Sequence, residues 1–402
     1  MEFDHLALDG TVRSTGRGPE RGMDTRLSHP EREGAGPDRA SWSELDGPPA
    51  RPHRPRPYNE PRRRRGRGWG LPVLLGSAAL LGAAAYFNHR AAEAAERRHP
   101  PRGRFLYVDG VRLHYIERGQ GEPVVLFHGN GALTDDMITS GLVERLALNH
   151  RVIVFDRPGF GYSGRPRTRI WTPMAQAELL YRAIHRLGIG QATILGHSLG
   201  ALVALSLALR HPSMVRGLVL LSGYYYPSVR FDVPLFSGPA IPVIGDVMRY
   251  TISPPAATAL LPKLYAKLFA PAPIPERFEA EFPHELIVRP SQLRAASADN
   301  NLMIPYAAKI HHLYPELRVP VTIVSGTEDQ VVTFERQARR LADEVPQADL
   351  VAVPGAGHMV HHFAPDLVAR ILERMAGNLS VNPAADTQHG SVREPEPLGG
   401  SY

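Results

Sequence analysis

The stretch Thr193-Ile194-Leu195-Gly196-His197-Ser198-Leu199-Gly200 decides the fold of this 402-residue chain. Its first three residues end an apolar, β-branched segment typical of a strand, and an apolar helix is predicted to follow at Ala201–Ala208. Because glycine has no Cβ, residues 196 and 200 allow a strand and a helix to cross closely around Ser198. The pattern predicts a sharp strand–turn–helix that exposes the serine hydroxyl, a nucleophile elbow. A glycine-rich turn without chemistry is the alternative interpretation.

Strand and helix patterns alternate on both sides of this turn. The predicted strands are 104–108, 111–117, 123–127, 151–155, 192–195, 218–222, 319–325 and 350–353. The predicted helices are 135–148, 174–187, 201–210, 335–344 and 365–375. Apolar strands that alternate with helices predict an α/β fold, with a mostly parallel sheet covered by helices on both faces. The core is therefore assigned to residues 104–226 and 318–377, and the proline-rich segment 227–317 to a cap.

Two loops after later strands offer the partners that a serine nucleophile needs. Serine is a weak nucleophile at neutral pH and requires a nearby base. The segment 321–325 leads to an acidic pair, and 351–353 leads to Pro354-Gly355-Ala356-Gly357-His358. Because the carboxyl ends of parallel strands meet at one edge of a sheet, these loops are expected to converge on Ser198. We predict His358 as the general base and Asp329 as the acid that orients it; the rivals are Glu328 as acid and His361 and His362 as bases.

The loop His128-Gly129-Asn130-Gly131 follows an apolar strand and is predicted to form an oxyanion hole. Backbone N–H groups of Asn130 and Leu199 would converge on the developing negative charge, and each such donor contributes about 3 kcal/mol in the transition state. A plain turn is the alternative interpretation of the loop. His128 itself is predicted to make structural hydrogen bonds and to carry no proton in catalysis.

A metal site is the alternative use of the histidines in the second half of the chain. It would be built from His358, His361, His362, His311 and His312. No carboxylate–histidine ligand motif frames these residues, so the sequence predicts neither a metal nor a cofactor.

Together these motifs resemble those of the α/β-hydrolase superfamily, in particular its branch with a cap after the sixth strand. The resemblance spans residues 105–376 and rests on His128-Gly129-Asn130-Gly131, the stretch Asp156–Ser163, the Ser198 turn, Asp329 and Gly357-His358. It implies an eight-stranded sheet, a Ser198–His358–Asp329 catalytic triad and no catalytic role for Asp156–Ser163. Relatives that open epoxides or displace halide usually carry aspartate at the nucleophile position, so Ser198 disfavours those activities.

The cap is expected to cover an apolar substrate pocket, because it contains many large apolar residues. These are Phe231, Val233, Leu235, Phe236, Ile241, Val243, Ile244, Leu260, Leu261, Leu264, Leu268 and Phe269. Such a cap suits an acyl chain better than a sugar or a phosphate, although helix packing is an equally ordinary use of any one of these residues. Tyr224–Tyr226 are predicted either to line the pocket entrance or to pack in the core. Asn300 and Asn301 are either substrate contacts or surface amides.

An uncharged stretch, 69–87, contains the apolar run Leu71–Phe87 and is predicted to be a single transmembrane helix that binds the chain to a membrane. Eight arginines lie in 51–68 and five in 88–104, which predicts a cytoplasmic N-terminal side and an extracytoplasmic catalytic portion. A cleaved signal peptide and a buried or surface helix are the alternatives. Residues 1–68 and 378–402 are predicted to be disordered tails, and 88–103 a juxtamembrane spacer.

The charge balance excludes several classes of protein. The chain has a net charge of +6, yet residues 105–402 carry 27 positive and 27 negative side chains, so the basic excess flanks the uncharged stretch. This distribution argues against nucleic acid as a partner, because a nucleic-acid-binding fold needs a basic face. The absence of cysteine excludes disulfides, thiol catalysis and cysteine-ligated metals.

The sequence therefore predicts a membrane-anchored serine hydrolase that cleaves carboxylic esters of apolar acids through an acyl-enzyme on Ser198. Carbon–carbon bond hydrolysis or cofactor-free perhydrolysis on the same triad is the nearest alternative, since the residues that would select between them lie in the cap. A non-catalytic binding module is the alternative from another class.

Overall fold

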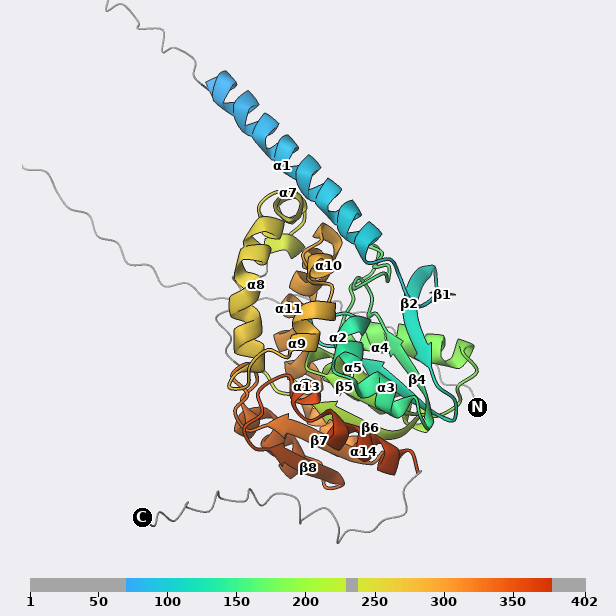
Figure 1. Cartoon of the computed structure of the whole chain (residues 1–402). Coiled ribbons are helices and arrows are strands. Elements are labelled where there is room, and N and C mark those ends of the chain that lie inside the picture. Colours follow the sequence, from blue (N-terminus) through green and yellow to red (C-terminus); the bar gives the residue numbers. More distant parts are fainter. Residues whose placement is uncertain (1–69, 229–237, 378–402) are drawn as a thin grey trace, which may run out of the picture. The chain divides into compact units, whose positions relative to one another are not determined.

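A computed structural model describes residues 70–228 and 238–377 of the chain. It contains one eight-stranded sheet in the order β1-β2-β4-β3-β5-β6-β7-β8, in which β1 and β2 are antiparallel to their neighbours and the other strands are parallel (Figure 1). The strands are β1 (Arg104–Val108), β2 (Val111–Arg118), β3 (Glu122–Phe127), β4 (His150–Phe155), β5 (Ala192–His197), β6 (Val215–Leu221), β7 (Val321–Gly326) and β8 (Ala348–Val353). This sheet confirms the predicted α/β fold class.

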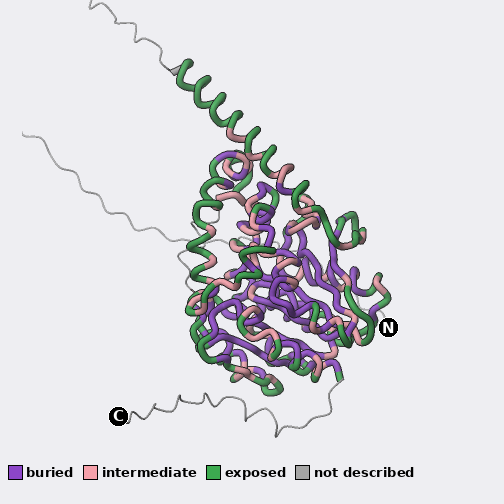
Figure 2. Tube along the Cα trace, viewed as in Figure 1, coloured by how far each residue is buried: buried purple, intermediate pink, exposed green. Residues whose placement is uncertain are grey.

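Helices cover both faces of the sheet. On one face, α4 (Pro173–Arg186), α5 (Leu199–Arg210), α11 (Pro290–Ile310) and α12 (Arg340–Glu344) contribute to a large apolar core. On the other face lie α2 (Thr134–Thr139), α3 (Leu142–Leu146), α13 (Val360–Phe363) and α14 (Pro365–Met375). Neighbouring residues of a strand point to opposite faces, so Val125 and Phe127 join the first core while Val124 and Leu126 join the second. The strands are accordingly buried along most of their length (Figure 2).

The predicted elements agree with the structure with one notable difference. The segment 135–148, expected to be one helix, forms two short helices, α2 and α3, that are interrupted at Gly141. Gly141 has a φ of 77°, a left-handed conformation that favours glycine and that a continuous helix does not contain. The three tyrosines Tyr224–Tyr226 are buried and belong to the first core, which settles their role as packing residues.

The cap follows β6 and consists of helices of 3 to 21 residues. They are η2 (Gly238–Ala240), α7 (Ile244–Tyr250), α8 (Ser253–Phe269), α9 (Glu276–Glu281), α10 (His284–Ile287), α11 and η3 (His311–Glu316). Phe269 packs against Phe278 and Phe282 in a third apolar cluster. The expectation that the cap's apolar residues line a pocket is wrong for Ile241, Val243, Ile244, Leu260 and Leu264, which are exposed. Phe231, Val233, Leu235 and Phe236 lie outside the described residues.

The apolar stretch near the N-terminus belongs to one long helix, α1 (Gly70–Arg98). The predicted spacer 88–103 is therefore helical up to Arg98 and continuous with the apolar part. Within the described part of the chain, α1 is the one helix long and apolar enough to cross a membrane, and its apolar segment is exposed to solvent. The predicted tails 1–68 and 378–402 fall outside the described residues.

Candidate active site

Ser198 lies on the turn between β5 and α5. Its backbone has a φ of 53° and a ψ of −119°, a strained conformation for a residue with a side chain, of the kind that costs about 1–3 kcal/mol. Two glycines make the turn possible: a Cβ on Gly196 would lie 2.5 Å from the carbonyl oxygen of Gly200. The elbow predicted from the sequence is therefore present, with the serine half-buried at the carboxyl end of the central strands.

His358 connects the serine to an acid. Its Nε2 lies 3.0 Å from the Ser198 Oγ, and its Nδ1 lies 2.8 Å from Asp329 Oδ2. A carboxylate only accepts hydrogen bonds, so Nδ1 carries the proton and the Nε2 lone pair accepts the serine O–H. The structure thus brings together the three side chains that the sequence singled out, from the loops after β5, β7 and β8.

Asp329 is fixed by its own loop. Its Oδ1 accepts backbone hydrogen bonds from Val331 (2.8 Å) and Val332 (2.9 Å), which leaves Oδ2 for His358. The rival Glu328 is exposed and makes no contact with His358 among the described residues. The geometry therefore favours Asp329 as the partner of His358.

The loop 128–131 lies against the serine turn. A Cβ on Gly129 would lie 3.2 Å from the Ser198 Cβ, and a Cβ on Gly200 would lie 2.4 Å from the Phe127 carbonyl oxygen. Only glycine permits both approaches. The loop that carries Asn130 thus lies close to the turn that leads into Leu199, the first residue of α5, and the oxyanion hole formed by their backbone N–H groups stays a prediction.

The side chain of Asn130 is used for another contact. Its Nδ2 donates to the Ala296 carbonyl oxygen (3.1 Å) and to Asn300 Oδ1 (2.7 Å), both on α11 of the cap. Asn300, considered as a substrate contact from the sequence, thus holds the 128–131 loop to the cap. Asn301 also has a polar contact within the structure.

His128 is a buried hydrogen-bonding residue, as predicted. Its Nδ1–H donates to the Gly129 carbonyl oxygen (2.7 Å), and its Nε2 accepts from the Arg157 backbone N–H (3.0 Å). Burial, together with the positive charge of Arg157, lowers the pKa of His128 from 6.5 to about 4. The neutral ring is the form that can make both bonds, because a protonated Nε2 cannot accept.

This lowered pKa predicts a loss of stability in mild acid. In the unfolded chain His128 takes up a proton near pH 6.5, whereas in the folded chain it stays neutral until about pH 4. Its contribution is therefore complete above pH 6.5 and is lost as the pH falls from 6.5 towards 4. We expect the drop in melting temperature between pH 7 and pH 4.5 to be about 5 °C smaller in His128→Gln, which keeps an acceptor that does not titrate. Equal drops in both proteins, measured by calorimetry, would contradict this role.

Arg157 joins this loop to the cap and is completely buried. Its Nη1 donates to Asp299 Oδ2 of α11 (2.8 Å), and its Nε and Nη2 donate to the carbonyl oxygens of His128 (2.9 Å) and Gly129 (3.1 Å). Arg165 binds the other oxygen of Asp299 (2.8 Å). Burial alone would raise the pKa of Asp299, but the charges of Arg165 and Arg157 outweigh it, and the pKa is lowered.

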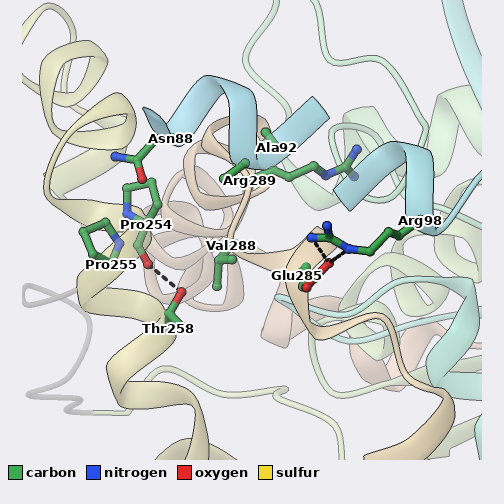
Figure 3. A pocket seen from close by; sticks show the side chains of 10 residues that line it. Asn88, Ala92, Arg98, Pro254, Pro255, Thr258, Glu285, Val288 and Arg289 are labelled. Atoms are coloured by element: carbon green, nitrogen blue, oxygen red, sulfur yellow. Dashed lines mark hydrogen bonds and ion pairs between the residues drawn. The ribbon is translucent and has the colours of Figure 1, made fainter. Parts of the chain in front are cut away.

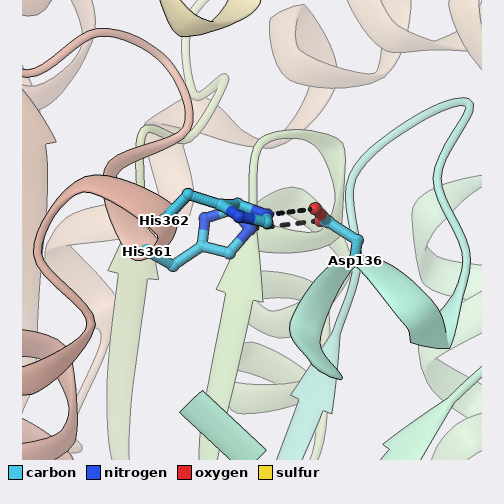
Figure 4. A group of neighbouring side chains, drawn as sticks. All are labelled: Asp136, His361 and His362. Carbon is cyan, nitrogen blue, oxygen red and sulfur yellow. Dashed lines mark hydrogen bonds and ion pairs between the residues drawn. The ribbon is translucent and has the colours of Figure 1, made fainter. Parts of the chain in front are cut away.

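A second buried polar cluster consists of Asp136, His361 and His362 (Figure 4). His361 and His362 do not contact Ser198; their Nε2 atoms donate to the two oxygens of Asp136 on α2, at 3.2 and 2.9 Å. Burial would raise the pKa of Asp136, but the two histidines hold it well below its usual range. The cluster therefore connects α13, which follows the loop after β8, to α2.

The three ligand atoms of this cluster lie within 4.8 Å of one another, a spacing that suits a metal ion as well as hydrogen bonds. The set differs from the one considered from the sequence: His358 binds Ser198 and Asp329, and the His311 ring instead lies beside Tyr226. The Nε2 atoms of both imidazoles already donate to the carboxylate, whereas the buried His361 Nδ1 has no hydrogen-bond partner among the described residues. The described residues thus do not bring the five histidines together as one ligand set.

His197 links this cluster to the candidate base. Its Nε2 donates to the His358 carbonyl oxygen (3.2 Å), and its Nδ1 lies 3.9 Å from Asp136 Oδ2. Burial and the neighbouring His361 and His358 lower its pKa well below the usual range, so the ring is neutral. His197, the residue before Ser198, thus helps to fix the backbone of His358.

Sequence reasoning missed Arg157, Asp299, Asp136 and His197 as residues that support the site. Arg157 belongs to the stretch Asp156–Ser163, which resembles α/β-hydrolases. Its position directly after an apolar strand was the signal that could have identified it. Asp299 and Asp136 carried no comparable signal, because their partners are 142 and 225 residues distant in sequence.

Comparisons with known proteins agree with this architecture. The model of a family described as alpha/beta hydrolase fold matches residues 122–365. A 2-hydroxymuconate semialdehyde hydrolase of Pseudomonas putida is 35% identical over 144 residues, which are 36% of this chain and 50% of that protein, so the match spans half of its length. Haloalkane dehalogenase 2 of Mycobacterium tuberculosis is 26% identical over 286 residues, covering 69% of this chain and 96% of that protein.

Among solved structures, a thermophilic esterase from Thermogutta terrifontis is similar in fold. It has a TM-score of 0.55 and 23% sequence identity, and the match covers 67% of this chain and 97% of that one. At this identity the likeness concerns the fold alone. The family match covers more than half of the chain and includes the segments that carry Ser198, Asp329 and His358, so this chain belongs to the family of proteins with the α/β-hydrolase fold.

Proposed function

We propose that the protein is a membrane-anchored serine hydrolase that cleaves carboxylic esters of apolar acids. The observation that carries the proposal is the hydrogen-bonded series Ser198–His358–Asp329, with distances of 3.0 and 2.8 Å, at the carboxyl ends of the strands. A serine with such a base at hydrogen-bond distance is equipped for nucleophilic catalysis.

Acylation would begin at the Ser198 hydroxyl. His358 Nε2 takes its proton as Oγ attacks the ester carbonyl carbon, and Asp329 stabilises the positive imidazole through Nδ1–H. The negative charge on the carbonyl oxygen is stabilised by the backbone N–H groups of Asn130 and Leu199. The tetrahedral intermediate then expels the alcohol, which receives the proton from His358, and an acyl-enzyme remains.

Deacylation would use the same groups in a second cycle. Water enters, His358 Nε2 takes one of its protons, and the resulting hydroxide attacks the acyl carbon. The Ser198 oxygen leaves, takes the proton back from His358, and the acid is released. The sequence of steps needs no metal and no cofactor.

The substrate class is tested with p-nitrophenyl esters of increasing acyl length. The catalytic portion carries no net charge and the cap is apolar, which favours an uncharged acyl chain. We expect kcat/KM to rise at least about tenfold from acetate to octanoate, because six methylenes are added and burial of only two of them, at about 0.8 kcal/mol each, already gives that factor. Absence of turnover with every short and medium ester, in protein that labels with a fluorophosphonate, would contradict the ester specificity while leaving the nucleophile intact.

Carbon–carbon bond hydrolysis is the second candidate function. It is favoured by the 35% identity with the 2-hydroxymuconate semialdehyde hydrolase over 144 residues. The same Ser198–His358 pair would serve that reaction, so turnover of 2-hydroxymuconate semialdehyde without turnover of esters would select it. Dehalogenation is disfavoured, although a haloalkane dehalogenase is among the relatives, because serine stands where such enzymes usually have aspartate.

The membrane anchor rests on α1. Its apolar part, Leu71–Phe87, exposes large side chains such as Leu74 (68%) and Leu80 (73%), which in water would be an unfavourable arrangement. Seventeen residues extend about 25 Å as a helix, which lies at the short end of the range that spans a bilayer. The excess of arginine before the apolar stretch, eight in 51–68 against five in 88–104, supports a cytoplasmic N-terminal side and an extracytoplasmic catalytic portion.

The double variant Leu74→Arg and Leu80→Arg tests this anchor. Each arginine at the centre of a membrane helix costs about 2.5–3.5 kcal/mol, so we expect most of the protein to move from the membrane fraction to the soluble fraction. Leu148→Arg, which changes an equally exposed leucine (80%) of the core domain, is the control and should stay with the membrane. Equal membrane retention of the unmodified chain, the double variant and Leu148→Arg after a carbonate wash would count against a spanning α1.

A further inference from the structure

An exposed apolar face lies on the cap. It comprises side chains of η2–α7 and the start of α8, namely Ile241 (45% exposed), Val243 (75%), Ile244 (60%), Val247 (48%) and Ile252 (56%). We call these five residues the cap apolar face. Large apolar patches on a folded chain mark sites that bind proteins or membranes. Val243 also has a φ of 66°, which is rare for a β-branched residue and shows that local strain is tolerated at the centre of this face.

The cap apolar face is fixed to α1 at the point where its apolar stretch ends. Asn88 is the first polar residue after Leu71–Phe87, and its Nδ2 donates to the carbonyl oxygens of Tyr250 (2.9 Å) and Thr251 (2.7 Å), at the end of α7. In a spanning helix the first polar residue lies at the boundary between the hydrocarbon and the headgroups. The end of α7 is therefore held at the level of the membrane surface.

The contact with α1 extends into the apolar stretch. Ala84, Ala85, Asn88, Ala92 and Ala95 are partly or fully covered, whereas Leu81, Tyr86 and Phe87 are exposed. The covered residues recur every three or four positions, which is one face of a helix. Ala84 and Ala85 lie one turn before Asn88 on this face, so the partial cover of α1 extends into its apolar stretch.

The seam between α1 and the cap is held by ion pairs farther along the helix. Arg98 binds Glu285 (2.6 Å), and Arg289 binds Glu96 (2.7 Å). Between these pairs and Asn88 lies a pocket lined by α1, by Pro254 and Pro255 of α8, and by Val288 (Figure 3). The seam thus has fixed points at both ends, so the cap keeps its orientation relative to α1.

Basic and apolar side chains border the cap apolar face. Arg167 binds Asp246 of α7 (2.6 Å), and this contact brings the 164–172 loop beside α7. In that loop Ile170 is 73% exposed. Ile170 thus adds a further exposed apolar side chain beside α7.

We propose that the cap apolar face inserts into the membrane leaflet through which α1 leaves the bilayer. The occupant of the face is therefore lipid, and the inference rests on the membrane anchor proposed above. Through this contact the enzyme would receive its apolar ester from the bilayer and not from water.

Helix α8 connects this face to the candidate base. It runs 17 residues, about 25 Å, from Ser253 next to the cap apolar face to Phe269. At its far end the Leu268 carbonyl oxygen accepts a hydrogen bond from the His358 backbone N–H (3.2 Å). A Cβ on Gly357 would lie 2.0 Å from the Ala270 carbonyl oxygen, so the two segments are in direct contact. The cap apolar face and the active-site loop are thus connected by one continuous helix.

The absence of cysteine in the chain permits a direct test with single labels. A polarity-sensitive fluorophore is placed on Val243→Cys, on Leu75→Cys in the apolar part of α1, and on Leu148→Cys as an exposed control. The full-length protein is reconstituted in vesicles of phosphatidylcholine with phosphatidylglycerol, with or without lipids that carry a nitroxide on the acyl chain. We expect blue-shifted emission and strong nitroxide quenching at 243 and 75, and neither at 148.

Each result decides between the two proposals. Quenching by lipid at 75 with an aqueous label at 243 overturns the docking of the cap and leaves the anchor standing. Quenching at 243 with an aqueous label at 75 supports docking and overturns the anchor. A blue shift at 243 without nitroxide quenching means that protein, such as a second copy of the chain, covers the face, and this result overturns the proposal.

An activity measurement gives an independent readout. For the pair Val243→Asp and Ile244→Asp, we expect the ratio of activity on a vesicle-embedded long-chain ester to activity on a water-soluble ester to fall about tenfold or more. Leu148→Asp, which adds one acidic residue elsewhere, should leave that ratio unchanged. An unchanged ratio in the double variant would refute delivery through this face. If every protein, including the unmodified chain, lacks both activities, the proposed ester hydrolase function is itself contradicted.

Discussion

Replacing Ser198 with alanine is expected to lower kcat by at least about 10⁴-fold and to abolish covalent labelling by a fluorophosphonate. The reason is geometric: among the residues that the structure describes, the Ser198 Oγ is the one hydroxyl within hydrogen-bond distance of His358 Nε2, at 3.0 Å. The elbow itself should persist, because alanine adds no bulk where the neighbouring glycines permit the close crossing. The measurement combines gel-based labelling with ester turnover, and the melting temperature reports whether the fold is retained.

Ser222 offers a matched control for this variant. It lies at the carboxyl end of the adjacent strand β6, is buried, and also has a positive φ, 42°. Its hydroxyl has no hydrogen-bond partner among the described residues. Ser222→Ala should therefore keep both labelling and turnover. If Ser198→Ala labels as strongly as the unmodified chain, the protein is not a serine hydrolase that acts through this residue.

Replacing Arg157 with methionine is expected to lower the free energy of unfolding by about 3–5 kcal/mol. The variant removes a completely buried guanidinium that binds Asp299, Gln176 and the carbonyl oxygens of His128 and Gly129. Asp299 would keep Arg165 but lose the partner of its second oxygen. Because the 128–131 loop loses its support, kcat should also fall, and chemical denaturation together with ester turnover measures both effects.

A surface pair gives the comparison for Arg157. Arg340 binds Glu344 at 2.8 Å, with the two side chains 47% and 33% exposed, and Arg340→Met should cost no more than about 1 kcal/mol. In a double-mutant cycle, Arg157→Met and Asp299→Asn should together cost less than the sum of the two single variants. A loss below about 1 kcal/mol for Arg157→Met would show that the cap is not held to the core by this ion pair.

The parts of the site that the sequence predicted are those that local rules determine. The elbow is specified by two glycines within five residues of chain, and Asp329 and His358 each follow directly on an apolar strand. Their convergence follows from the parallel arrangement of the strands, which the alternation of elements implies. Asp329 and Glu328 are neighbouring acids in the same turn. Only the backbone hydrogen bonds of that turn show that Asp329 is the one directed inward.

The supporting residues depend on contacts between distant segments. Arg157 meets Asp299 only after the cap folds back on the core, and Asp136 meets His361 only when α2 and the loop after β8 come together. The exposure of Ile241, Val243 and Ile244, which the sequence assigned to the pocket or to helix packing, likewise depends on contacts between distant segments. Apolar composition predicts burial in a core, and only the arrangement of α7 beside α1 shows which side chains remain uncovered.

The continuity of α1 has a mechanical consequence. No turn separates the apolar stretch from the part that binds the cap, so any tilt of the helix is transmitted to α7, α10 and the cap as a whole. A hydrophobic stretch of about 25 Å is shorter than the usual 30 Å core, and such a stretch is accommodated by local thinning of the bilayer. On the proposed anchor, this thinning would bring the lipid closer to α7 and the cap, so acyl-chain length in the surrounding membrane would influence turnover.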